Sequence, residues 1–297
     1  MFSDPPSGID ALHDALFGGA IVRFSGLSAM AELVAFTRDF LVRQLGPHDP
    51  VRIHEALDRQ ALAEVLSQVQ RTFSNAPETK RLWRALFDEI GLDPQDTTRD
   101  RLFLRFQPPI PDEGGPHDAR STATVGFHRD SWGTNLYAQV NWWAPVHPIT
   151  AGRTFAFLPE LFDQPIPNDS ESFDIAQVMA HNRAAPPGAP RMRMTPRPLE
   201  EIDAARGRPV VIDPGEIIAF SSQHAHVGVP NRTGHTRISL ETRSLRLSDL
   251  RSGRGAPNVD GRARWVAYSL FRRLSDGEAL APLLGVNTLE PFVIHEA

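Results

Sequence analysis

The hydrophobic pattern of the chain changes its period near residue 101, and this change constrains the fold more than any other feature. Before it, apolar residues recur at mostly helical spacing. After it, Leu102, Leu104 and Phe106 occupy alternate positions, until Pro108 and Pro109 end the run. Because alternate residues of a strand lie on one face of a sheet, strands are expected to begin here.

Short strand-like runs continue along the later part of the chain, at residues 124–127, 136–143, 154–158, 210–212, 217–220 and 237–245. Turns rich in Pro, Gly and Asp separate them, such as Asp213-Pro214-Gly215. No helix-length periodic segment alternates with these runs, which argues against a βαβ fold. The pattern favours an antiparallel double-sheet barrel or jelly roll, which makes an α+β fold together with the N-terminal helices.

Helical spacing covers residues 9–45 and 53–90, with a short β-like piece at 20–24, and Gly91 is placed to end the second region. A further helix is expected near the C-terminus, over residues 262–274. We interpret the 297 residues as a single catalytic domain. Its expected parts are a mainly helical N-terminal layer (1–100), a jelly-roll core (101–245) with a lid-like insertion (163–209), and a C-terminal extension (246–297).

The residue inventory excludes several kinds of chemistry. The chain has no cysteine, so it has no disulfide, thiolate zinc site, iron–sulfur cluster or cysteine nucleophile. Lys80 is the only lysine, which excludes a catalytic Schiff-base lysine and a Walker-type GK[ST] motif. Any bound metal must therefore use His, Asp or Glu side chains.

Charge and hydropathy narrow the expected partners and location. The formal net charge is −5, and no segment gathers enough positive charge to follow a phosphate backbone, so nucleic acid is not an expected partner. The first residues form neither a basic leader nor an apolar run, and no stretch of about 18 apolar residues occurs. We expect a cytoplasmic protein that does not insert into a membrane.

His128 and Asp130 form the first candidate metal-binding pair. They stand at the end of a strand-like run, and side chains at positions i and i+2 of an extended chain leave the same face. A third ligand would complete a facial set of two histidines and one carboxylate, which suits Fe(II) and leaves positions open for a chelating cosubstrate and oxygen. His224 and His226 are both candidates, and spacing alone does not choose between them.

Four short motifs carry a family resemblance. They are F-H-R-D at 127–130, D-P-G-E at 213–216, H-V-G-V-P-N at 226–231 and T-R-I-S-L at 236–240. In this order they resemble the iron(II)/2-oxoglutarate dioxygenases, and among them the phytanoyl-CoA dioxygenase-like branch, over roughly residues 100–245. The resemblance implies a double-stranded β-helix core, with iron(II), 2-oxoglutarate and dioxygen as cofactor and cosubstrates.

The resemblance also implies roles for individual residues. His128, Asp130 and His226, and not His224, match the iron ligands, and Arg237 matches the arginine that pairs with the distal carboxylate of 2-oxoglutarate. The chemistry asks for such an arginine independently, because a carboxylate deep in a barrel is costly unless a guanidinium pairs with it.

Further site residues are predicted on the neighbouring strands. In the run 138–145, either Gln139, Asn141 and Trp143 or the alternate set with Trp142 faces the barrel, and the resemblance favours Trp142 beside the cosubstrate. Thr154 is a candidate hydrogen-bond donor to 2-oxoglutarate, and Arg105 and Arg243 are candidate substrate contacts. For Arg243, a simple ion pair with Glu241 is the favoured alternative.

The predicted function is a 2-oxoglutarate-dependent hydroxylase of an unactivated C–H bond in a small molecule, such as a secondary metabolite, an acyl or amino-acid derivative, or a sugar acid, with release of succinate and CO2. Asp130 favours this outcome, because the related iron halogenases replace that carboxylate with a small residue. The alternative is a catalytically inert jelly-roll module that binds a sugar or other small ligand. A cupin-type isomerase is disfavoured, since it would leave Arg237 without a purpose. The sequence does not indicate the oligomeric state.

Overall fold

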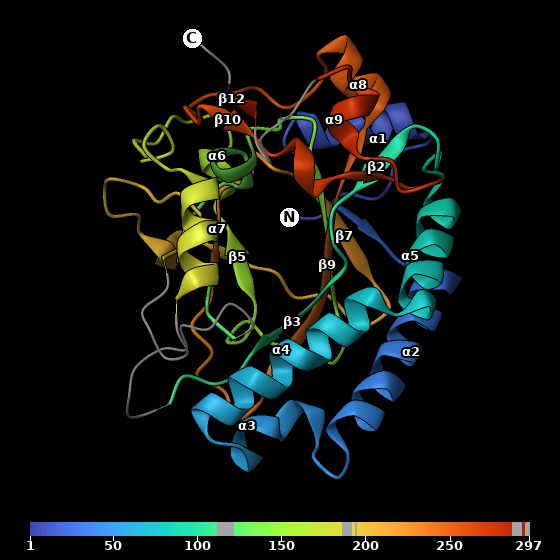
Figure 1. Cartoon of the computed structure of the whole chain (residues 1–297), viewed down its shortest axis with the longest axis vertical. Coiled ribbons are helices and arrows are strands. Elements are labelled where there is room, and N and C mark those ends of the chain that lie inside the picture. Colours follow the sequence, from blue (N-terminus) through green and yellow to red (C-terminus); the bar gives the residue numbers. More distant parts are fainter. Residues whose placement is uncertain (112–121, 186–191, 194, 287–292, 295–297) are drawn as a thin grey trace.

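The computed structural model describes residues 1–111, 122–185, 192–193, 195–286 and 293–294. Helices pack on the outside of a seven-stranded and a three-stranded antiparallel sheet, and a third sheet has two strands (Figure 1). The N-terminal part is helical, as predicted, and contains α1 (Ile9–Phe17), β1 (Val22–Phe24), α2 (Ser28–Leu45), α3 (Ile53–Ala56), α4 (Arg59–Asn75) and α5 (Pro77–Ile90). Asp58 caps α4 by accepting a hydrogen bond from the Ala61 N–H, and Gly91 ends α5 with a left-handed φ of 93°.

The larger sheet has seven strands in the order β1-β7-β4-β9-β2-β11, with β3 also paired to β9, and all of its pairings are antiparallel. Its strands beyond β1 are β2 (Thr97–Arg99), β3 (Phe103–Gln107), β4 (Val140–Pro145), β7 (Ile217–Ser221), β9 (Arg237–Arg246) and β11 (Arg272–Arg273). Strands β4 and β9 lie at the centre of this sheet.

The smaller sheet consists of β6 (Arg208–Pro209), β5 (Phe155–Phe157) and β8 (His226–Gly228), again antiparallel. Aromatic side chains join it to the larger sheet: the Trp143 and Phe155 ring centroids lie 5.1 Å apart, and those of Phe157 and Phe220 lie 4.8 Å apart. The two sheets therefore face each other across a shared core, which confirms the predicted jelly roll with a helical layer.

The opposite face of the larger sheet packs against the helices. Trp142 is central to this second core, with its ring 5.5 Å from that of Phe87 in α5 and 5.9 Å from that of Phe24 in β1. Leu62, Leu66, Val69 and Phe73 of α4 are buried at spacings of four and three residues, so they form one apolar stripe on that helix. This stripe explains why a helix rich in polar residues still folds against the sheet.

Several local predictions differ from the structure. Residues 124–127 and 210–212 are not strands, although Val125 and Val210 still take part in backbone hydrogen bonds with Gly228 and Phe155. The strand expected at 136–143 begins later, at Val140. The predicted helix over 262–274 is wrong: the segment contains β10 (Trp265–Val266), a 3-10 turn (Tyr268–Leu270) and β11. Two interactions override the helical spacing of this segment: its strands pair with β12 and β2, and the Trp265 indole N–H donates to the Phe173 carbonyl oxygen at 2.8 Å.

The remaining elements are short. They are α6 (Asp130–Thr134), α7 (Ile175–Ala184), α8 (Leu247–Ser252), α9 (Leu280–Leu283), β12 (Val293–Ile294) and the 3-10 turns Pro50–Arg52, Pro159–Leu161 and Ala204–Arg206. Over the described part of the chain, no helix combines the length and apolar character that crossing a membrane requires.

Candidate metal centre

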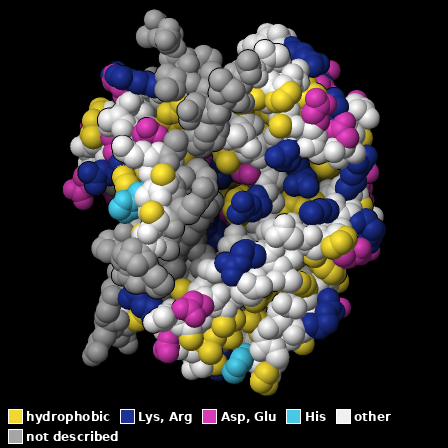
Figure 2. All heavy atoms as spheres, viewed as in Figure 1, with side chains coloured by type: hydrophobic (Ala, Val, Ile, Leu, Met, Phe, Trp, Pro, Cys, Tyr) yellow, Lys and Arg dark blue, Asp and Glu magenta, His cyan; other side chains and the backbone are white. Residues whose placement is uncertain are grey.

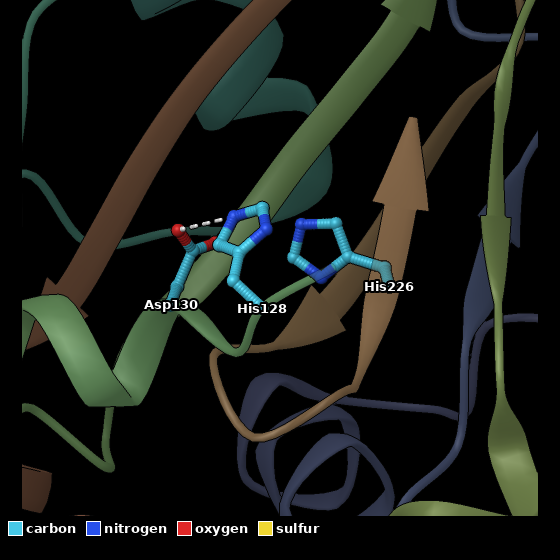
Figure 3. Close-up of side chains that lie close together, drawn as sticks. All are labelled: His128, Asp130 and His226. Carbon is cyan, nitrogen blue, oxygen red and sulfur yellow. Dashed lines mark ion pairs between the residues drawn. The ribbon is translucent and has the colours of Figure 1, made fainter. Parts of the chain in front are cut away.

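His128, Asp130 and His226 come together in one cluster. Each offers one possible ligand atom, and these atoms all lie within 4.8 Å of one another. Figure 3 shows the Asp130 carboxylate beside the His128 ring, with the His226 ring on the other side of His128. The His128 Nε2 and Asp130 Oδ1 atoms are 3.7 Å apart, and the two imidazole centroids are 4.2 Å apart. These are the three residues that the family resemblance named.

Backbone pairing positions the two histidines. His128 and His226 form an isolated antiparallel bridge, in which each N–H donates to the carbonyl oxygen of the other residue at 3.0 Å. Residues directly opposite in an antiparallel pair place their side chains on the same face. Arg129 has an extended backbone (φ −110°, ψ 142°), so Asp130, the first residue of α6, leaves on the same side as His128.

Hydrogen bonds to backbone carbonyls orient both imidazoles. The His128 Nδ1 atom lies 2.9 Å from the Gly126 carbonyl oxygen, and the His226 Nδ1 atom lies 2.9 Å from that of His224. A neutral imidazole that donates from Nδ1 has its lone pair on Nε2, which is the form that binds a metal. Burial, with a smaller contribution from His128, lowers the pKa of His226 to about 3, so this ring is neutral at neutral pH.

A chain of amide side chains holds the carboxylate ligand. Asn141 donates from Nδ2 to the Oδ2 atom of Asp130 at 2.7 Å, and Gln139 donates to the Oδ1 atom of Asn141 at 2.8 Å. The other carboxylate oxygen, Oδ1, faces His128. Burial opposes the ionisation of Asp130, yet His128 and Arg243 together hold its pKa well below the usual range. The site therefore presents one carboxylate and two imidazoles whose Nδ1 atoms face backbone carbonyl oxygens.

His224 is used elsewhere, which resolves the choice that spacing left open. Its Nε2 atom lies 3.1 Å from the Gly19 carbonyl oxygen and its Nδ1 atom 3.2 Å from that of Ser221. Its ring packs 4.8 Å from that of Phe162. Both ring nitrogens thus have partners outside the metal-binding group. His226 instead lies among Phe155, Phe157 and Phe220, with centroid distances of 5.9, 6.1 and 5.7 Å.

Arg237 begins β9 and is buried, with 7% of its surface exposed. Its Nε and Nη1 atoms are buried without a hydrogen-bond partner among the described residues. Burial lowers the pKa of Arg237 to about 10, which Glu241 partly offsets. A buried guanidinium with unused donors is energetically costly in the absence of a ligand, and a carboxylate is the ligand that its geometry suits best.

Two predicted site residues are corrected by the structure. Trp142 faces the helical layer and donates its indole N–H to the Ser244 hydroxyl at 2.8 Å, so it does not border the site. The barrel-facing set is the other one, because Asn141 contacts Asp130 and Trp143 packs against Phe155. Thr154 is buried and donates its hydroxyl hydrogen to the Val210 carbonyl oxygen at 2.6 Å, so that hydrogen is not available to a cosubstrate.

Arg105 and Arg243 both lie on the interior face of the larger sheet. Arg105 pairs in register with Ser239, and Arg243 with Asn141. The Arg105 guanidinium lies 3.3 Å from the Glu241 carboxylate. The acid nearest to Arg243 is Asp100, at 3.7 Å, and not Glu241 as the sequence favoured. Both arginines stay candidates for contact with a substrate.

Sequence reasoning did not assign a role to Asn141, Gln139 or Arg129. Gln139 and Asn141 could have been predicted if the face of the strand 138–145 that points into the barrel had been known, since Asn141 shares that face with Trp143. Arg129 lies between two ligands of the candidate centre, but its side chain turns away from them into a set of backbone carbonyls and Asp260. Nothing in the sequence separates this arginine from the others.

Comparison with known proteins finds distant structural likeness only. No family model matches the chain, and no curated protein matches it. Among solved structures, the chain is similar to EvdO2 from Micromonospora carbonacea var. aurantiaca in complex with 2-oxoglutarate, with 13% identity over 81% of this chain and 92% of that one and a TM-score of 0.44.

Two further similar structures come from nogalamycin biosynthesis. The α-ketoglutarate-dependent carbocyclase SnoK has 12% identity over 86% of this chain and 96% of its own, with a TM-score of 0.43. The epimerase SnoN, in complex with Fe3+, α-ketoglutarate and nogalamycin RO, has 15% identity over 86% and 98%, with a TM-score of 0.39. Because these TM-scores lie below 0.5, the likeness is too distant to indicate a function for this chain.

Proposed function

We propose that this protein is a mononuclear iron(II)- and 2-oxoglutarate-dependent oxygenase that acts on a small molecule. The observation that carries the proposal is the combination of two features inside one jelly roll. One is the cluster of His128, Asp130 and His226, and the other is a buried guanidinium, Arg237, with unused donors. A metal-binding group alone would fit many reactions, whereas the additional buried arginine calls for an anionic ligand.

The residues present fit a ferrous ion. Two imidazoles and one carboxylate form the facial donor set that Fe(II) oxygenases use, and such a set leaves coordination positions open. The carbonyls of Gly126 and His224 orient the imidazoles, and Asn141 orients the carboxylate. In the part of the chain that the structure describes, no other group of histidine and acidic side chains meets the criteria for a metal site.

Arg237 fits the distal carboxylate of 2-oxoglutarate. It lies on the interior face of β9, opposite Gln107 of β3, and its donors are buried and unused. When bound, ferrous iron and 2-oxoglutarate would supply the oxidising chemistry for a C–H bond, with dioxygen as the oxidant and succinate and CO2 as co-products. The protein's own contribution is to bind and orient these groups and to exclude water through the aromatic core around His226.

Hydroxylation of an unactivated C–H bond is the outcome that we propose. Asp130 supports it, because a carboxylate at this position fills the place that a halide would need. An inert ligand-binding jelly roll is disfavoured, because it has no use for three ligand-competent side chains held by outer hydrogen bonds.

Anaerobic reconstitution tests the proposal. Addition of Fe(II) and then 2-oxoglutarate to the purified protein should produce a weak visible charge-transfer band. His128→Ala should abolish the band, whereas His181→Ala, which removes an exposed histidine of α7, should leave it unchanged. Absence of the band in protein with a native circular dichroism spectrum would contradict the proposed function.

A further inference from the structure

Arg243 lies near the candidate carboxylate ligand Asp130, and its one ion pair, with Asp100, is long at 3.7 Å. In the pairing of β4 with β9 it stands directly opposite Asn141, so the two side chains share the interior face of the sheet. Asn141 in turn donates to Asp130. The Arg243 guanidinium is therefore close to the candidate centre, and the electrostatic influence of Asp130 on its pKa agrees with this position.

The guanidinium of Arg243 makes no hydrogen bond to any described residue. Its nearest acidic oxygen is Oδ2 of Asp100 at 3.7 Å, which is beyond the 2.7–3.2 Å range of ordinary N–H···O hydrogen bonds. Its side chain is 27% exposed, so solvent and small solutes can reach it. Apart from this long ion pair with Asp100, the N–H donors of the fork are available to a ligand.

The neighbouring acids, in contrast, already have partners. Oδ1 of Asp100 accepts the backbone N–H of Arg101 at 2.5 Å. Glu241 accepts hydrogen bonds from Arg105 at 3.3 Å and from the Ser239 hydroxyl at 3.1 Å. Among Asp100, Glu241 and Arg243, the side chain that makes no hydrogen bond is therefore the cation, Arg243. A bound group that completes the set must supply acceptor oxygens, and an anionic one would pair with the guanidinium best.

The surface around these strands agrees with an anionic ligand. β3 and β9 cross the centre of the view in Figure 1, and in the same view Figure 2 shows several dark blue side chains beside a central hollow. Since Lys80 is the only lysine of the chain, nearly all of these side chains are arginines. A positive rim of this kind attracts anions over a distance of about a Debye length.

From these observations we infer that the small-molecule substrate carries an anionic oxygen group, a carboxylate or a phosphate ester, which Arg243 binds beside the metal centre. The inference rests on the proposed function in so far as it places the substrate at that centre. Arg105 has a lesser part, because Glu241 already engages it. The anion site is distinct from Arg237, which lies at the start of β9, six positions before Arg243 along the strand.

Matched probes test the inference. Benzoate, benzamide and phenyl phosphate differ in charge while sharing one ring, and their dissociation constants can be measured by NMR titration of protein loaded anaerobically with Fe(II) and saturating 2-oxoglutarate. We expect at least one anion to bind about 10-fold more tightly than benzamide, as one charge-assisted hydrogen-bonded pair would provide. The stronger of the two anions identifies the chemistry of the group.

Variants locate the effect. Arg243→Gln should reduce the preference for the anion to less than about 3-fold, and Arg243→Lys should keep an intermediate preference, because an ammonium retains charge without the planar fork. Arg264→Met removes a guanidinium that is 69% exposed and should change nothing. If either Arg243→Gln or Arg243→Lys folds poorly, the other variant still tests the site.

The outcomes separate the two proposals. Four results would each overturn the inference. The anions and benzamide could bind equally, or neither anion could bind detectably. The anion could displace 2-oxoglutarate, or the preference for the anion could survive Arg243→Gln. A preference that depends on Arg243 in a protein that never forms the visible band would support the anion site and contradict the proposed function. A protein that forms the visible band but binds anions and benzamide equally would support the proposed function and contradict the anion site.

Discussion

Arg129 and Arg237 are both buried in the same jelly roll, but their hydrogen bonding differs completely. Arg129 donates from Nε to Asp260 at 3.0 Å, and its terminal nitrogens donate to the carbonyl oxygens of Gln223, Leu161, Gln164 and Phe162 at 2.5, 2.5, 2.7 and 3.2 Å. Two nitrogens of Arg237 have no partner among the described residues. Since burial without hydrogen bonds is costly, the first arginine stabilises the fold and the second is poised for a ligand.

Asp260 extends the contrast, because it connects Arg129 to Trp132, two residues after the candidate ligand Asp130. Its carboxylate accepts hydrogen bonds from Arg129, from the Trp132 indole at 2.7 Å and from the Ile166 N–H at 3.1 Å. Three parts of the chain, residues 129–132, Ile166 and Asp260, thus meet at one ion pair. A fully satisfied network of this kind holds a ligand-bearing segment in one conformation.

Removal of the Arg129 guanidinium should have the largest effect. Arg129→Met leaves Asp260 as a buried carboxylate without its cation, and we expect the free energy of unfolding to fall by about 3–5 kcal/mol. Urea denaturation of the metal-free protein measures this change. Arg264→Met, which breaks an exposed ion pair, should cost about 0–1 kcal/mol in the same assay. A loss below 1 kcal/mol for Arg129→Met would mean that the network does not support the fold.

Removal of the Arg237 guanidinium should show the opposite behaviour. Arg237→Met is expected to weaken 2-oxoglutarate binding by about 100-fold, since a bidentate charge-assisted pair is lost. Without 2-oxoglutarate the variant should be no less stable than the parent, because no protein hydrogen bond breaks. Titration of the visible band and urea denaturation measure the two quantities. Unchanged 2-oxoglutarate affinity together with reduced stability would assign Arg237 a structural role.

Asn141 should have an intermediate effect that is confined to the metal. Asn141→Ala removes the donor to Oδ2 of Asp130, and loss of such an outer hydrogen bond weakens metal binding by about 10–100-fold. Competition with a chelator for bound Ni(II) measures the affinity. Asn75→Ala, at an exposed position near the end of α4, is the matched control. Equal affinities in the parent and in Asn141→Ala would show that the carboxylate does not need this support.

Substitution of the adjacent residues Trp142 and Trp143 by Phe should change the free energy of unfolding least among these predictions. Trp142→Phe loses a buried hydrogen bond to Ser244 and should cost about 1–2 kcal/mol in the free energy of unfolding. Trp143→Phe removes an N–H that has no partner among the described residues, so it should cost less. Thermal and urea unfolding compare the two, and 2-oxoglutarate affinity should be unchanged in Trp142→Phe. A larger loss of affinity for Trp142→Phe than for Trp143→Phe would reverse our assignment of the strand faces.

Local spacing explains which parts of the candidate site were accessible from the sequence. His128 and Asp130 share a face because one extended residue, Arg129, separates them, and such a relation depends only on the local backbone. The choice of His226 over His224 came from a family resemblance. In the structure it depends on a bridge to His128, almost a hundred positions earlier, which no local pattern reports.

The errors have the same origin. The phase of β4 decides whether Trp142 or Trp143 faces the barrel, and both faces of this strand are buried, so hydrophobic alternation carries no signal. The Thr154 hydroxyl donates to the Val210 carbonyl oxygen, more than fifty positions away, and no local pattern reports such a contact. The segment 262–274 has helical spacing, but β2 and β12 pair with its two ends.

The amino-acid sequence by itself determined the helical layer, the change to strands near residue 101, the absence of thiolate and lysine chemistry, and the pairing of His128 with Asp130, because each follows from composition or from neighbours along the chain. Only the tertiary structure decided which arginines are satisfied and which have donors left for a ligand. Hydrogen-bond satisfaction depends on groups that are distant in sequence and meet only when the sheets close, and this is why Arg129, Arg237 and Arg243 look alike until the chain is folded.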